Sequence, residues 1–256
     1  MIDAHIHLYG SDLHPETLSE GSRLGITLFV GSSLLNYTPQ PTYEETIQAN
    51  DDMAKAIRNH PGQVEGYCYV NPRHGHKSLM DFRRRVEEQG FIGLKLWIAT
   101  LCNDPLVFPY VEQAIQYKAP ILVHAWKKTI SQFPYESTAH HVADLAARYP
   151  EARIIMAHLG GQMESAINII EPYENVYADT SGTPIGGSEV GYAVKRLGAK
   201  RIIFGSDLPF ACMASNLGKI VGANLSETDF RLVTYENMKF LIDEVKQNRG
   251  LVKTVY

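Results

Sequence analysis

The sequence contains little cysteine and no long apolar run. Its 256 residues include three cysteines, none of them in a Cys-x-x-Cys pair, which argues against a disulfide framework or a thiolate zinc site. No run of about 18 apolar residues is present, and the chain starts with Met-Ile-Asp-Ala-His instead of a basic segment followed by an apolar one. We therefore predict a reduced, soluble, cytoplasmic protein that does not associate with membranes.

An excess of positive charge is lacking as well. The chain has 24 Lys and Arg against 28 Asp and Glu, which gives a formal net charge of −4. The one dense basic cluster, Arg83–Arg85, is followed by Glu87 and Glu88, as expected of a solvated helix face. The sequence thus offers no basic surface for a phosphate backbone, and we predict a small-molecule substrate and no nucleic-acid partner.

A Gly-x-Gly-x-x-Gly turn, which would favour an open, doubly wound sheet, does not occur in the sequence. Internal repeats, linkers and low-complexity segments are also absent from it. With 45% apolar residues the chain can bury one substantial core. We predict a single domain over residues 1–256, and a homodimer is left open because dimers are frequent among folds of this size.

Eight short apolar or β-branched runs predict strands, and segments with helical periodicity separate them. The predicted strands cover residues 2–8, 25–31, 64–70, 91–97, 120–125, 152–158, 174–180 and 201–207. The predicted helices cover residues 42–60, 76–90, 104–118, 137–149, 161–171, 187–198, 213–222 and 227–247. Parallel neighbours need a crossover of about a dozen residues, which these helical segments supply. The pattern predicts an α/β fold of the (β/α)₈, or TIM-barrel, type.

Polar side chains interrupt the predicted strands at their carboxyl ends. His5 and His7 are two residues apart, so strand alternation points both imidazoles to the same face. Later strands end at His124, His158 and Asp207. One such residue is as easily a satisfied core group, but five that converge on one barrel mouth are better explained by a shared ligand. A divalent cation would compensate the burial of imidazoles and a carboxylate, so we predict a metal site there.

Short motifs in a fixed order resemble those of a known enzyme group. They are the opening Ile-Asp-Ala-His-Ile-His, Gly-Leu-Lys-Leu at 93–96, Val-His at 123–124, Ala-His-Leu-Gly-Gly at 157–161, Phe-Gly-Ser-Asp-Leu-Pro at 204–209 and the Asn-containing segment 235–240. Together they resemble the amidohydrolase superfamily, most closely its amidohydrolase-related branch (amidohydrolase 2). That branch comprises metal-dependent hydrolases and non-oxidative decarboxylases built on a TIM barrel.

The resemblance implies roles for the residues at the strand ends. One divalent metal ion, zinc with manganese, iron or cobalt as alternatives, would be held by His5, His7, His124 and Asp207. His158 and Asp207 would be catalytic. A bound divalent ion lowers the pKa of its water, and Asp207 would then relay the proton to the leaving group while His158 stays free for acid/base work.

Lys95 is the residue for which the resemblance leaves two roles open. If it is carboxylated, it would bridge two metal ions, with His158 on the second; if it is unmodified, its ammonium would bind an anionic group of the substrate. We favour one metal. The loops beyond the strand ends should carry further substrate contacts, and the candidates are Trp97, Arg73, Trp126, Lys127 and Lys128.

The sequence leaves three functions open. The leading prediction is hydrolysis of a small, carboxylate-bearing ester, lactone or amide by a metal-activated water. The alternative is metal-dependent, non-oxidative decarboxylation of an aromatic or unsaturated acid, in which His158 or Asp207 protonates the ring carbon. A barrel that binds a small molecule without catalysis is the third. The motifs do not separate hydrolysis from decarboxylation, because one fold and one metal site serve many chemistries.

Overall fold

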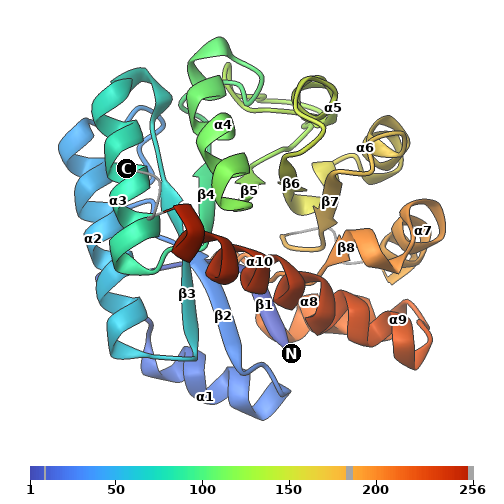
Figure 1. Cartoon of the computed structure of the whole chain (residues 1–256). Coiled ribbons are helices and arrows are strands. Elements are labelled where there is room, and N and C mark those ends of the chain that lie inside the picture. Colours follow the sequence, from blue (N-terminus) through green and yellow to red (C-terminus); the bar gives the residue numbers. More distant parts are fainter. Residues whose placement is uncertain (9, 183–186, 253–256) are drawn as a thin grey trace.

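The computed structural model describes residues 1–8, 10–182 and 187–252. Eight parallel strands follow one another in chain order, each hydrogen-bonded to the next (Figure 1). They are Ile2–His7 (β1), Leu28–Ser32 (β2), Val64–Tyr69 (β3), Gly93–Leu96 (β4), Pro120–Val123 (β5), Arg153–Met156 (β6), Val176–Asp179 (β7) and Ile202–Ile203 (β8). Each of the eight strands overlaps its predicted range, and the ends differ by a few residues.

The sheet closes on itself through the segment that follows β8. The Ala4 amide donates to the Phe204 carbonyl at 3.0 Å, and the Asp207 amide donates to the His5 carbonyl at 2.8 Å. A parallel bridge joins Ile6 to Leu208. These bonds make a nearly closed barrel and confirm the predicted TIM-barrel fold. They also hold Asp207 directly beside the two histidines of β1.

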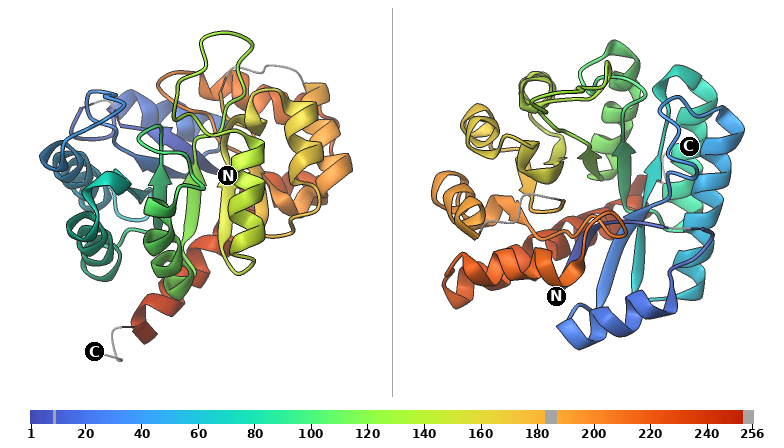
Figure 2. Two further views of the ribbon diagram at one scale, coloured as in Figure 1. Left: turned by 90° about the horizontal axis from the view of Figure 1, so that it is seen from above. Right: turned by 180° about the vertical axis from the view of Figure 1, so that it is seen from behind.

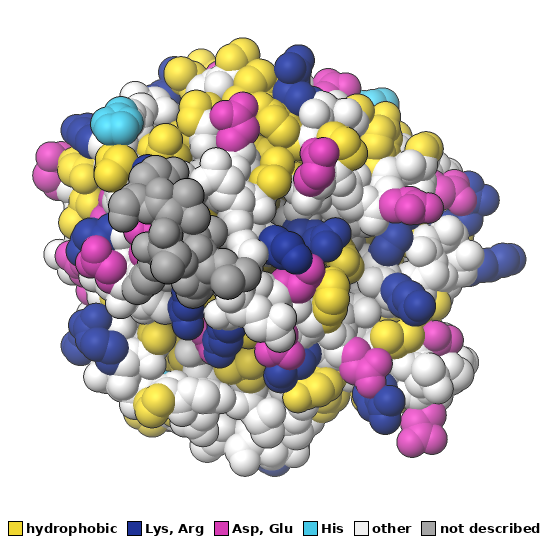
Figure 3. Space-filling model, viewed as in Figure 1, with side chains coloured by type: hydrophobic (Ala, Val, Ile, Leu, Met, Phe, Trp, Pro, Cys, Tyr) yellow, Lys and Arg dark blue, Asp and Glu magenta, His cyan; other side chains and the backbone are white. Residues whose placement is uncertain are grey.

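Helices surround the barrel on the outside (Figure 2). They are Pro15–Leu24 (α1), Tyr43–Asn59 (α2), His76–Gln89 (α3), Phe108–Tyr117 (α4), Ala139–Arg148 (α5), Met163–Ile170 (α6), Gly187–Leu197 (α7), Met213–Gly222 (α8), Glu227–Arg231 (α9) and Asn237–Val252 (α10). Among these described helices, none is long and apolar enough to cross a membrane. Figure 3 shows basic and acidic side chains interspersed over the face seen in Figure 1.

The sequence analysis missed α1. This helix packs through Gly21, where an added Cβ would lie 2.4 Å from the Phe29 ring, and its only large apolar residues are the partly buried Leu18 and Leu24, which are too few to reveal a helical period. Three predicted bounds were also wrong. β2 starts at Leu28, β8 ends at Ile203 because the chain turns into the closing segment, and the long helix predicted at 227–247 is divided into α9, a π-turn at 232–236 and α10.

Helix α10 crosses the amino end of the barrel, opposite the mouth (Figure 1). Arg153, at the start of β6, pairs with Glu244 of α10 at 3.2 Å, and Lys246 of α10 pairs with Glu65 at the start of β3. The helix therefore covers that end of the barrel. The carboxyl ends of the strands, where the five polar residues lie, form the opposite end.

Candidate active site

The two histidines of β1 are buried and held in one tautomer. His5 is 0% exposed and its Nδ1 lies 2.8 Å from Asp179 Oδ2. His7 Nδ1 lies 3.0 Å from Ser32 Oγ and 3.4 Å from the Ser32 carbonyl. A carboxylate and a carbonyl only accept, so both Nδ1 atoms carry the hydrogen. Each Nε2 therefore presents a lone pair to the barrel mouth, as a neutral metal-binding imidazole does.

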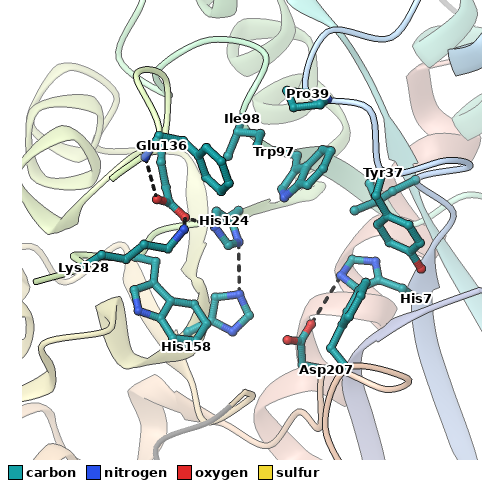
Figure 4. A pocket seen from close by; sticks show the side chains of 14 residues that line it. His7, Tyr37, Pro39, Trp97, Ile98, His124, Lys128, Glu136, His158 and Asp207 are labelled. Carbon is teal, nitrogen blue, oxygen red and sulfur yellow. Dashed lines mark hydrogen bonds and ion pairs between the residues drawn. The ribbon is translucent and has the colours of Figure 1, made fainter. Parts of the chain in front are cut away.

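These lone pairs converge with a carboxylate oxygen. His5 Nε2 and His7 Nε2 are 3.3 Å apart, and Asp207 Oδ1 lies 3.8 Å and 3.4 Å from them (Figure 4). Three acceptors facing one another repel unless a cation lies between them. Donor atoms about 2.1 Å from a tetrahedral metal are about 3.4 Å apart, so the three residues fit one divalent ion.

His158 and His124 complete the cluster. Ligand atoms of His5, His158 and Asp207 also lie within 4.8 Å of one another, and all three residues are buried. His124 Nδ1 is 3.1 Å from His158 Nε2, while its Nε2 is 2.9 Å from Glu136 Oε1. Glu136 thus fixes the hydrogen on Nε2, and His124 could bind a metal only through Nδ1. His158 is placed as a ligand at least as well as His124, and the division of roles between them stays a prediction.

Asp179 positions this cluster, and the sequence analysis did not single it out. Its Oδ2 contacts His5 Nδ1, and its Oδ1 accepts the His158 amide at 2.9 Å and the Ser181 amide at 3.0 Å. Asp179 is fully buried at the carboxyl end of β7. The rule that found the other polar residues at strand ends therefore applied to this residue too. Carboxylates behind metal-binding imidazoles fix the tautomer and raise ligand basicity.

Asp179→Asn is expected to lower metal affinity about 10- to 100-fold. The amide can still accept from His158 and Ser181 through its oxygen, but its NH₂ would then face His5 Nδ1 and move the imidazole hydrogen to Nε2. The measurement is Mn²⁺ and Zn²⁺ titration by calorimetry. Asp243→Asn, at a 43% exposed side chain on α10, is the matched control. Equal metal affinity in the wild type and Asp179→Asn would contradict this role.

The His158 ring is held between two other rings. Its backbone adopts a left-handed conformation, with φ of 60°, directly after β6. The His5 ring lies 5.1 Å away on one side and the Trp126 ring 5.0 Å away on the other. Gly182 leaves the space for this placement, because a Cβ there would come within 2.9 Å of His158 Nδ1. The imidazole therefore has little freedom to rotate.

The electrostatics keep the imidazoles neutral and one carboxylate charged. Burial lowers the pKa of His7 and His124 and lowers that of His5 and His158 further still. Burial acts to raise the pKa of Asp207, but its close contacts with His7, His158 and His5 favour the charged carboxylate and hold this pKa below its usual value. Neutral nitrogens beside an anionic oxygen are the ligand set that a divalent transition metal prefers.

Lys95 lies within the cluster rather than in the pocket. Its side chain is 0% exposed, with Nζ 3.0 Å from His5 Nε2. Burial lowers the pKa of Lys95 to about 8, although Asp207 and Asp179 act to raise it. An ammonium here donates to the lone pair of His5, so Lys95 and a metal ion compete for the same nitrogen. Both roles predicted for Lys95 stay predictions.

A cavity of about 380 Å³ opens beside the cluster (Figure 4). It is lined by polar residues of the cluster and by aromatic and aliphatic residues of the loops: His7, Leu34, Tyr37, Pro39, Trp97, Ile98, His124, Trp126, Lys128, Phe133, Glu136, His158, Asp207 and Phe210. Its volume and largely aromatic wall suit a small, flat ligand.

Three of the five residues predicted to contact substrate line this cavity, and two do not. Trp97, Trp126 and Lys128 line the cavity, whereas Arg73 and Lys127 do not. Arg73 donates to the Ala99 carbonyl and lies over the ring of Tyr135. Lys127 lines a smaller pocket on the α5 side. Both belong to loops, whose paths strand periodicity does not predict, and neither geometry supports a direct substrate contact.

Glu136 is a pocket residue that the sequence analysis missed. It is 3% exposed and binds His124 Nε2, Lys128 Nζ at 2.9 Å and, through Oε2, the side chain of Gln132. It lies in the loop between β5 and α5, twelve residues after His124. Nothing in the local sequence distinguishes it from a surface glutamate. The loop between β5 and α5 folds back and places Glu136 beside His124.

The family model described as amidohydrolase matches residues 2–237. The chain belongs to the amidohydrolase family. The match includes every strand of the barrel and all five polar residues at the strand ends. The match confirms the family that the sequence motifs resembled.

Several solved structures share the fold of this member of the amidohydrolase family. One is 2,6-dihydroxybenzoate decarboxylase complexed with 2,6-dihydroxybenzoate, at a TM-score of 0.78 and 15% identity, covering 94% of this chain and 97% of that one. A second is 5-carboxyvanillate decarboxylase LigW from Sphingomonas paucimobilis, at 0.74 and 18%, covering 91% and 83%. A third is dihydroxybenzoic acid decarboxylase from Polaromonas sp. JS666 with bound manganese and the inhibitor 2-nitroresorcinol, at 0.76 and 17%, covering 94% and 96%.

Proposed function

We propose that this member of the amidohydrolase family is a metal-dependent decarboxylase of a small aromatic acid. The observation that carries the proposal is the aromatic cavity beside the His/Asp cluster, with Trp97, Tyr37 and Phe210 on its walls. The similar decarboxylases, which were solved with a hydroxybenzoate or with manganese and a nitroresorcinol, support it. The leading prediction from the sequence was hydrolysis; these findings favour the alternative.

We propose one divalent ion, manganese or zinc, held by His5, His7 and Asp207 with His158 or His124 as a further ligand. The distances between the ligand atoms and the facing lone pairs support this set. When bound, such an ion acts as a Lewis acid toward a substrate oxygen and anchors the anionic acid.

The side chains of the chain would orient the ring and supply a proton. Aromatic walls hold a flat ring by stacking and edge contacts. Asp207, held as a carboxylate, or His158, held neutral, would take up a proton from solvent in the cavity that both line and deliver it to the ring carbon that bears the carboxylate. As the new C–H bond forms, the C–C bond to the carboxylate breaks and its electron pair returns to the ring. One carboxylate and one proton thus give one arene and one CO₂.

The test is product analysis in D₂O. Protein loaded with Mn²⁺ or Zn²⁺ is incubated with hydroxy- and methoxybenzoates, and CO₂ and arene are measured together. We expect equal amounts of both, with one deuterium at the former carboxyl position. A parallel panel of esters, lactones and amides tests hydrolysis. Turnover of that panel without CO₂ release from any acid would overturn the proposal and restore hydrolysis.

A further inference from the structure

The cavity has two walls of different chemistry. One wall carries the metal-site residues His7, His158 and Asp207. Figure 4 shows Pro39, Ile98 and Trp97 on the opposite side. The charged groups that line the cavity outside the cluster, Lys128 and Glu136, pair with each other at 2.9 Å. A ligand bound at the metal therefore faces a largely apolar wall at its far edge.

Trp97 supplies a hydrogen-bond donor on that apolar wall. Trp97 is half-buried, and its indole N–H, which remains accessible, has no protein acceptor within the described ranges. Figure 4 shows the indole nitrogen on the side of the ring that faces the cavity and His124. An indole N–H only donates. An acceptor brought in by a ligand would satisfy it.

The ring of Trp97 is held in a fixed direction. It follows β4 directly, and the Leu96 carbonyl at that strand end accepts the His124 amide at 2.9 Å. The Tyr37 ring meets it edge to face at 6.4 Å, and Phe210 supports Tyr37 at 4.8 Å. The donor is thus built into the barrel and does not depend on a loop alone.

Trp126, the second tryptophan of the chain, is oriented differently. A Cβ added at Gly161 would lie 2.8 Å from Trp126 Nε1, so the indole nitrogen abuts the Gly161 backbone. Its ring packs against His158 at 5.0 Å and shapes the metal-side wall. Trp126 therefore contributes a surface to the cavity, whereas Trp97 contributes a donor.

We propose that the Trp97 N–H donates a hydrogen bond to the oxygen of a hydroxyl or alkoxy substituent on the substrate ring and so selects the ring position that carries this substituent. This inference rests on the proposed function. With the carboxylate anchored at the metal and the ring oxygen at Trp97, the ring has two fixed points. It cannot rotate in its plane, and the carbon to be protonated stays beside Asp207 and His158.

The test compares pairs of acids of equal shape. The 2-, 3- and 4-isomers of methoxybenzoate are each paired with the matching ethylbenzoate, in which CH₂ replaces the oxygen. Binding to Mn²⁺-loaded protein is measured by calorimetry, without need for turnover. The wild type should bind one methoxy isomer about 5- to 10-fold more tightly than its ethyl partner, as expected for one hydrogen bond. Trp97→Phe keeps a flat ring against Tyr37 and should abolish this preference.

Trp126→Phe is the matched control and should keep the preference, because the nitrogen it removes faces Gly161. The proposal is overturned if no methoxy isomer is preferred by the wild type, if Trp97→Phe retains the preference, or if none of the six acids binds. A preference without CO₂ release would overturn the proposed function and leave the Trp97 donor standing. The binding measurement therefore tests the Trp97 donor, and the turnover measurement tests the proposed function.

Discussion

A His5→Ala/His7→Ala double variant is expected to lose its bound metal and at least about 1,000-fold of its turnover. Both Nε2 atoms face the same point, 3.3 Å apart, and their tautomers are fixed from behind by Asp179 and Ser32. Removing the pair takes away two of the proposed ligands and leaves Asp207 with only His158 or His124, which is too small a ligand set to hold an ion against solvent. The wild type should contain about one ion per chain, as a mononuclear site of this ligand set does.

The measurement is elemental analysis of the purified protein, with turnover assayed in added Mn²⁺. His76→Ala is the matched control, because His76 is exposed at the start of α3 and far along the chain from the cluster. It should retain metal and activity. Metal retained in the double variant, or a wild type that neither contains nor binds metal, would refute the site. Two ions per chain would favour carboxylated Lys95 over the single-metal prediction.

The barrel could be predicted from the sequence because its strands are short, apolar and regularly spaced. Most strand residues are buried on both faces of the sheet, so β5, Pro-Ile-Leu-Val, is recognisable as an apolar run without alternation. The candidate metal-site residues were recognisable for the converse reason: a polar histidine or aspartate is not expected at the end of a buried apolar run. That unexpected polarity identified His5, His7, His124, His158 and Asp207.

The rest of the site depends on contacts between distant segments. Asp179 contacts His5 across 174 residues of sequence, and Glu136 reaches His124 only because its loop folds back. Tyr37 and Phe210 meet at 4.8 Å from loops at opposite ends of the chain. Periodicity carries no information about such pairings. The aromatic cavity, on which the proposed decarboxylation rests, was therefore beyond the sequence analysis.

The Lys95 ammonium and a metal ion would compete for the same lone pair on His5 Nε2. Lys95 Nζ lies 3.0 Å from His5 Nε2, inside a cluster whose imidazoles are all kept neutral by burial. A divalent ion at His5 would repel an ammonium at that distance. Metal binding should therefore displace the side chain of Lys95 or favour its neutral form. Lys95 thus connects metal occupancy to the charge of the cluster.

Asp207→Asn is expected to reduce turnover at least about 1,000-fold even when the site is saturated with metal. The amide has almost the shape of the carboxylate and keeps the backbone bond to the His5 carbonyl. It is a weaker ligand than the carboxylate, and it cannot carry the proton to the ring carbon. The weaker ligand lowers metal affinity, and the loss of proton transfer remains visible at saturating Mn²⁺.

The two losses separate in a titration of turnover against Mn²⁺. If Asp207 only binds the metal, excess Mn²⁺ should restore the Asp207→Asn variant to within about tenfold of the wild type, and the proton transfer would then fall to His158. If Asp207 also transfers the proton, the plateau stays low at every metal concentration. Asp243→Asn, on α10 at the other end of the barrel, should match the wild type in both affinity and plateau. The height of the plateau therefore assigns the proton donor between the two residues.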